Sequence, residues 1–244
     1  SPYTLSLHDA LPIYRMSRVD AYMTLSGVLK ATENIPDPKS LRDKMGLLAQ
    51  FIQRDMTAQL ASGAADTVLI NNALILLASL FWKTEPLPAD FCVFVLEHAI
   101  ATFEDPQISK DVAKHLMFVV GQQNFSPKIM TPERAARVLK ATHEIAEHVR
   151  GKSIVLGRLG IYRKLLKQSK PSLIANNDWL KDMFEDMLVS VKEVRSPVIA
   201  FGFEAALQFG TQLKVSRAVV ELFQAPHEKR SEEHTSELQS PVLS

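Results

Sequence analysis

The fold class is decided by the stretch Thr131-Pro-Glu-Arg-Ala-Ala-Arg-Val-Leu-Lys-Ala-Thr-His-Glu-Ile-Ala-Glu-His-Val149. Its apolar and small side chains recur on one helical face, namely Ala135, Val138, Thr142, Ile145 and Val149. The charged side chains lie off that face, namely Arg134, Arg137, Lys140, Glu144 and Glu147. The pair Thr131-Pro132 is typical of a helix start, because Thr can cap the first free N–H groups and Pro has none to lose. This stretch therefore predicts an amphipathic helix that must bury one stripe against neighbours.

The same helical periodicity covers almost the whole chain, and no convincing strand alternation is present. Capping residues and breaks in the pattern predict helix starts near Arg15, Pro38, Asp66, Pro88, Pro106, Thr131, Lys152, Asn177, Ser196 and Lys214. Every second start, beginning with Arg15, recurs after 40 to 51 residues. Two helices in a unit of about 40–47 residues are typical of HEAT and armadillo arrays. The sequence therefore predicts an all-α, HEAT/armadillo-type helical repeat (α-solenoid). An irregular single-core bundle is the alternative, because the units share little sequence identity.

In such an array, the apolar stripes of successive helix pairs form one continuous buried strip. The periodicity predicts that eight large side chains contribute to it: Leu47, Phe51, Leu76, Phe94, Phe118, Leu139, Leu159 and Phe203.

The composition excludes several classes of protein. The net charge is +1, with 46% hydrophobic and 23% charged residues, so there is no global attraction to nucleic acid or membrane. A single cysteine, Cys92, excludes a disulfide framework and a metal site built from several cysteines. It lies in an apolar run, which predicts a buried structural thiol. No apolar run has the roughly 18 residues expected of a membrane span.

Both ends of the chain resemble in-frame translations of common sequencing adapters. The resemblance covers residues 4–13 and residues 230–240. We therefore expect residues 1–13 and 230–244 to be tails without a role in folding, and residues 14–229 to be a helical-repeat segment of a larger protein.

Sequence patterns for catalysis or metal binding are weak. His143 and His148 are five residues apart, so they fall on different helical faces rather than on the shared face that a zinc pair needs. The sequence Gly151-Lys-Ser153 resembles the end of a phosphate-binding loop, but it lacks the preceding glycine and strand. An acidic cluster is interpreted as a solvated face: Asp182, Glu185 and Asp186. We expect no catalytic residue, metal or cofactor.

Charge is segregated along the chain. Residues 128–170 contain eleven Lys and Arg against three Glu, whereas residues 61–127 have a net charge of −4. A basic surface attracts the phosphates of nucleic acid without reading base sequence. The candidate DNA-backbone contacts are Arg134, Arg137, Lys140, Arg163, Lys164, Lys167 and Lys170. A solvated basic face without a partner is the simpler alternative.

Several strings resemble the N-terminal domain of the telomere-associated Rap-interacting factor family. They are Asp20-Ala-Tyr-Met-Thr-Leu-Ser-Gly-Val-Leu-Lys30, Lys44-Met-Gly-Leu-Leu-Ala-Gln-Phe-Ile-Gln-Arg-Asp55, Phe125-Ser-Pro-Lys-Ile-Met-Thr131, Val149-Arg-Gly-Lys-Ser153 and Ser196-Pro-Val-Ile-Ala-Phe-Gly202. The likeness covers Arg15–Phe223.

The resemblance implies a nuclear protein of chromosomes and telomeres, with roles in replication timing and DNA-end protection. It implies a hook-shaped helical-repeat domain that can bind DNA, and partners among chromatin or telomere proteins. The phosphatase-docking motifs of the family are absent, since Arg18-Val-Asp-Ala21 lacks the required aromatic. We expect a non-enzymatic scaffold that contacts DNA without sequence preference and does not bind membrane. A protein-binding helical-repeat scaffold without DNA contact is the alternative.

Overall fold

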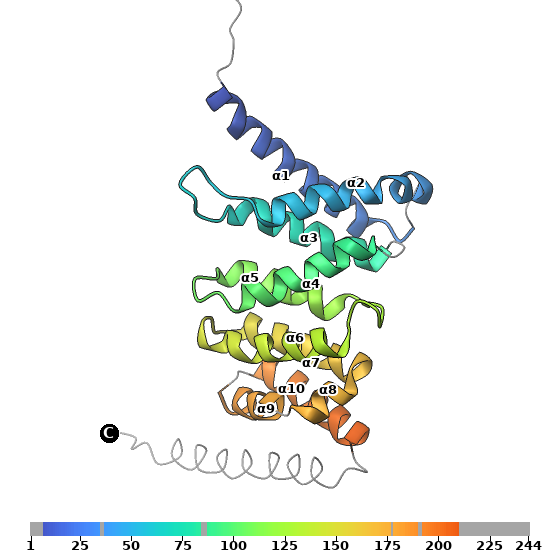
Figure 1. The fold of residues 1–244 in the computed structure, drawn as a ribbon, viewed down its shortest axis with the longest axis vertical. Coiled ribbons are helices and arrows are strands. Elements are labelled where there is room, and N and C mark those ends of the chain that lie inside the picture. The colour runs from blue at the N-terminus through green and yellow to red at the C-terminus, as the bar shows by residue number, and fades with distance from the viewer. Residues whose placement is uncertain (1–6, 35–36, 84–86, 177, 190–191, 210–244) are drawn as a thin grey trace, which may run out of the picture.

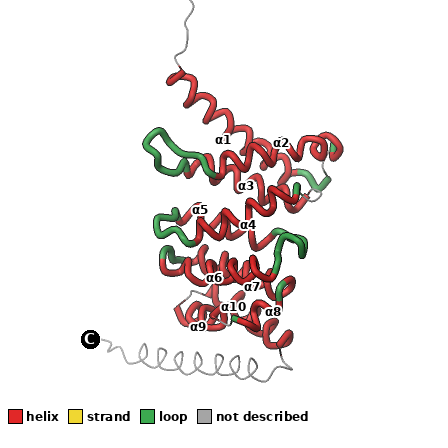
Figure 2. The backbone as a smooth tube through the Cα atoms, viewed as in Figure 1, coloured by secondary structure: helices red, strands yellow, loops and turns green. Residues whose placement is uncertain are grey.

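The computed structural model describes residues 7–209, except 35–36, 84–86, 177 and 190–191. These residues form helices joined by loops (Figure 2). They include one isolated β-bridge, between Gln59 and Ala65. The helices are α1 (Leu7–Ala31), α2 (Pro38–Met56), α3 (Thr67–Lys83), α4 (Ala89–Phe103), α5 (Lys110–Gln122), α6 (Pro132–Glu144), α7 (Lys152–Gln168), α8 (Lys170–Ala175), α9 (Asp178–Val189) and α10 (Lys192–Phe209). The all-α prediction is therefore confirmed.

Local capping explains why most predicted starts agree with the structure to within one residue. Thr131 accepts a hydrogen bond from the N–H of Arg134, and Asp37 accepts one from the N–H of Ser40. Asp66, buried at the start of α3, accepts from the N–H of Leu69 at 3.3 Å. These side chains satisfy N–H groups that the first helical turn leaves free.

Three predicted helix starts were wrong, and one helix was not predicted. Helix α1 begins at Leu7, eight residues before the predicted start and inside the predicted tail. Helix α5 begins at Lys110 rather than near Pro106, because Asp105 accepts from the N–H of Gln107 in a turn and Ser109 supplies the cap. Helix α10 begins at Lys192 and includes Pro197 within its first two turns. The short α8 was not predicted, and the predicted start near Lys214 lies outside the described residues.

The helices stack in two layers along the long axis of the molecule (Figure 1). One layer contains α1, α3, α5, α7 and α10, each packed on the next, and the other contains α2, α4 and α6 followed by α8 and α9. Helices from the two layers also pair, as α2 with α3, α4 with α5 and α6 with α7. In a single-core bundle, α1 would also pack against α5 or α7. Within the described part of the chain, it makes no substantial contact with either helix. The arrangement is an α-solenoid, and from α1 to α7 every second helix belongs to the same layer.

The core lies between the two layers, and the prediction of which large residues fill it was half right. Leu76, Leu139 and Leu159 are buried, and Phe94 is partly buried. The prediction was wrong for four others, whose exposed fractions are 51% for Leu47, 40% for Phe51, 47% for Phe118 and 60% for Phe203. A helix buries the stripe of side chains that faces its neighbours. Adjacent residues point about 100° apart around the helix axis, so a residue next to a buried one in sequence can be exposed. In α5, Met117 and Val119 are buried while Phe118 between them faces outward.

Candidate nucleic-acid interface

Helix α6 presents the first group of predicted contact residues. Its buried face packs against α4 and α7, and Arg134, Arg137 and Lys140 follow each other at three-residue intervals off that face. Both guanidinium groups bind the same carboxylate of α4. The Arg134 Nε atom is 3.0 Å from Oε1 of Glu97, and the Arg137 Nη1 atom is 2.9 Å from Oε2. Arg134 also donates to the backbone oxygen of Ile129 at 3.0 Å.

These contacts reduce the charge that α6 offers to a ligand. Partial burial alone would raise the pKa of Glu97, but the hydrogen bonds from Arg134 and Arg137 outweigh it, and the pKa is lowered. Glu97 is therefore an anion that offsets one of the two positive charges. Lys140 lies 3.8 Å from Glu144 one turn along the helix. Three cations of α6 thus face two carboxylates.

The second group lies on α7 and the first residue of α8, and we call Arg163, Lys164, Lys167 and Lys170 the basic strip. Gly151 has a φ of 126°, a value that L side chains rarely adopt, and α7 begins directly after it. The exposed side of α7 then carries Arg163 and Lys167. Lys164 is half-buried, and burial followed by the nearby charge of Lys167 lowers its pKa.

The contacts of the basic strip leave most of its charge available. Arg163 Nε lies 3.5 Å from the carboxylate of Glu204 in α10. Lys164 donates to the side-chain oxygen of Asn124 and Lys170 to the backbone oxygen of Gln208, each at 2.6 Å. Lys170 also lies 5.3 Å above the ring of Phe209. Among the residues that the structure describes, Lys167 has no hydrogen-bond or ion-pair partner, so four cations face one carboxylate.

The seven predicted residues therefore form two separate groups. Arg134, Arg137 and Lys140 belong to the layer of α4 and α6, and the basic strip faces α10 and the segment after α5. No hydrogen bond or ion pair joins the two groups within the described ranges. The basic strip has the larger unbalanced charge and is the better candidate for a phosphate contact.

Sequence reasoning missed a buried ionic network between α6, α7 and α9. Asp182 is 3% exposed, and its carboxylate lies 2.5 Å from the Nη2 atom of Arg158 and 2.7 Å from Nδ1 of His143. Tyr162 donates its hydroxyl to the same carboxylate. Arg158 also donates to the backbone oxygen of Thr142 and lies 3.8 Å from Asp186.

This network corrects the prediction of a solvated acidic face. Asp182 is buried and Asp186 is largely buried, and Glu185 is the exposed member of the three. Arg158 is one of the eleven basic residues in 128–170, but the network buries it and neutralises its charge, so it does not contribute to a basic surface. The sequence does place Asp182 and Asp186 on one helical face, which was the available sign of a shared partner. That partner, Arg158, lies 24 residues before Asp182 in the chain, so the sequence did not identify it.

Cys92 is buried, as predicted. Burial raises the pKa of its thiol to about 11. At neutral pH it therefore stays protonated and is a poor nucleophile. None of the helices within the described ranges combines the length and apolarity that a bilayer span requires.

Comparison with known families agrees with the resemblance seen in the sequence. The family described as Rap1-interacting factor 1 N terminal matches residues 13–243, nearly the whole chain. No curated protein and no solved structure matches the chain.

Proposed function

The chain belongs to the Rap1-interacting factor 1 N-terminal family, and from this premise we propose that it is a scaffold segment that contacts the DNA backbone through its basic strip. The family is one of telomere-associated, nuclear scaffold proteins. A non-enzymatic segment of such a protein would hold chromosomal partners in place rather than convert a substrate. Roles in replication timing and DNA-end protection belong to this proposal.

The observation that carries the proposal is the charge of the basic strip. Of its four cations, Arg163 contacts a carboxylate, Lys164 and Lys170 bind neutral oxygens, and Lys167 has no hydrogen-bond or ion-pair partner among the described residues. Lys and Arg displace counterions from DNA, so binding strength follows the number of phosphates contacted. Such contacts fix position without reading bases, and we therefore expect binding without sequence preference.

A salt titration tests the proposal. The affinity for a 30-base-pair duplex of mixed sequence is measured by fluorescence anisotropy between 50 and 200 mM salt. If the four cations each contact a phosphate, the slope of log K against log salt should be about −3.6, since each contact contributes about −0.9. Replacing Lys164 and Lys167 by Glu should flatten the slope to about −1.8 and weaken binding.

The matched control replaces Lys39 and Lys44 by Glu. Both are exposed lysines of α2, a helix that does not pack against α7, and the charge change is the same. For this control variant, the slope of log K against log salt should stay close to that of the unchanged protein. Equal slopes in the two double variants, or no binding at 50 mM salt, would contradict the proposal and favour a scaffold that binds only proteins.

A further inference from the structure

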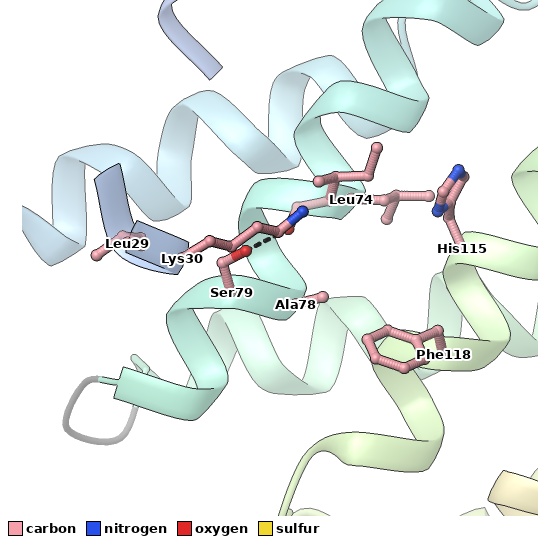
Figure 3. Close-up of a pocket in the computed structure, with 8 residues that line it drawn as sticks. Leu29, Lys30, Leu74, Ala78, Ser79, His115 and Phe118 are labelled. Carbon is pink, nitrogen blue, oxygen red and sulfur yellow. Dashed lines mark hydrogen bonds between the residues drawn. The ribbon is translucent and has the colours of Figure 1, made fainter. Parts of the chain in front are cut away.

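A groove opens between α1, α3 and α5, away from the basic strip. Its volume is about 510 Å³, within the range of pockets that receive ligand side chains or small molecules. Eight residues line it: Leu29, Lys30, Leu74, Ile75, Ala78, Ser79, His115 and Phe118 (Figure 3). We call this the apolar groove.

The surface of the apolar groove is almost entirely hydrocarbon. Phe118 is 47% exposed, a large fraction for an aromatic ring with apolar neighbours. Ser79 donates its hydroxyl to the backbone oxygen of Ile75 in its own helix at 3.0 Å, so this group is already satisfied (Figure 3). The interior of the groove therefore favours apolar side chains.

Its rim carries one cation, Lys30. Lys30 lies in the last turn of α1, and His115 lies one turn before Phe118 on α5. Among the described residues, no carboxylate lines the groove. Burial lowers the pKa of His115, and the charges of Lys114 and Lys30 lower it further, while Asp111 acts in the opposite direction. Lys30 and Lys114 thus both place positive potential at the imidazole, and an acidic group at this rim would meet complementary charge.

We propose that the apolar groove binds an amphipathic helix of a partner protein, with aliphatic or aromatic side chains against Phe118 and Ile75 and with Asp or Glu facing Lys30 and His115. A helix lays one apolar face into a groove through side chains spaced three or four residues apart. A peptide that binds by strand addition would need the open edge of a sheet, and the described residues include no sheet. The groove and the basic strip lie on different helices, so this proposal can fail without affecting the DNA proposal.

Selection from a phage-displayed library of random 16-residue peptides tests the proposal directly. Peptides that bind the full chain should carry two apolar residues spaced three or four apart, with Asp or Glu beside them. Synthetic copies of the enriched peptides are then measured by anisotropy. Phe118→Ala and Lys30→Glu should each weaken binding about tenfold or more, because each removes a contact that the peptide desolvates.

Two controls match these variants. Phe203→Ala removes another exposed phenylalanine, on α10, and Lys44→Glu reverses another exposed lysine, on α2. Both should leave peptide affinity within about twofold, and thermal melting of all four variants shows that the fold is kept. The pKa of the His115 ring, followed by NMR, should rise when the peptide binds, because a nearby carboxylate favours the imidazolium.

Three results would overturn the proposal. They are a selection without enrichment, enrichment of basic or purely polar peptides, and enriched peptides that bind the Phe118→Ala and Lys30→Glu variants as tightly as the unchanged protein.

Discussion

The two buried carboxylates of the ionic network, Asp182 and Asp186, differ in how well their negative charge is compensated. Asp182 is compensated by Arg158, Tyr162 and His143, so its burial is matched by direct contacts. Asp186 lies one turn further along α9, with Arg158 at 3.8 Å as its counter-charge. The pKa of Asp186 is raised to about 6, because burial and the charges of Asp182 and Glu185, which raise it, outweigh the charge of Arg158, which lowers it. The ionised form of Asp186 is therefore unfavourable in the folded protein.

The pKa of Asp186 predicts a stability that depends on pH. An unfolded Asp has a pKa of about 3.9, below the folded value of about 6. Between these values the folded state binds more protons, so its stability falls as the pH rises. Asp186→Asn, which imitates the protonated form, should raise the free energy of unfolding at pH 7 by about 2–3 kcal/mol. The gain should vanish near pH 4.

Denaturant unfolding of both proteins from pH 4 to pH 7 measures this difference. Glu185→Gln, at an exposed neighbour, should change the free energy of unfolding by less than about 0.5 kcal/mol. If Asp186→Asn is less stable than the unchanged protein at pH 7, the ion pair with Arg158 outweighs burial and the prediction is wrong.

How closely two helices pack depends on the size of the residues at their interface. Helices α5 and α7 make the most extensive contact in the described structure, and Gly121 faces Gly160 within it. A Cβ atom on Gly121 would lie 3.1 Å from the carbonyl carbon of Gly160 and 3.3 Å from the nitrogen of Ile161. These are backbone atoms, which cannot move without displacing α7. A Cβ atom on Gly160 would meet nothing within 4 Å.

The two glycines should therefore respond differently to the same change. Gly121→Ala should lower the free energy of unfolding by about 1–3 kcal/mol, because it forces two packed helices apart. Gly160→Ala should be neutral or stabilising by up to about 1 kcal/mol, because alanine favours the helix and has room. Denaturant unfolding of both variants checks this, and equal effects at the two positions would show that the close approach does not control stability.

The whole molecule is a linear array in which a unit contacts only its neighbours. Helix α3 packs on α1, α2 and α5, whereas α9 and α10 pack on α7 and on each other. In such arrays stability is approximately a sum of units and of the interfaces between adjacent units. Damage at one end should therefore have little effect at the other.

Hydrogen exchange can follow this independence. Leu76→Ala removes a fully buried side chain of α3 and should cost about 2–5 kcal/mol. Exchange should accelerate in α1, α2, α3 and α5, while protection of α9 and α10 stays within error. Phe201→Ala, at a fully buried position of α10, should give the converse pattern. Uniform loss of protection in either variant would indicate a single cooperative core instead.

The sequence by itself determined the all-α class, the spacing of helices in alternate layers, most helix starts and the family. Helical periodicity, Pro at the first turn, and caps such as Thr131 and Asp37 act within a few residues, so they can be read along the chain. The basic residues of α7, such as Lys167, could likewise be identified as candidate phosphate contacts from the sequence.

Only the tertiary structure decided which faces are buried and which charges remain available. Phe118 and Phe203 fit an apolar pattern and yet point outward, because the partners of each helix, rather than its own sequence, select the buried stripe. Arg134 and Arg137 share Glu97, at least 37 residues earlier in the chain, and Arg158 is buried against Asp182. A charge count along the sequence cannot include these neutralising partners, because electrostatic interaction depends on distance in space rather than on separation along the chain.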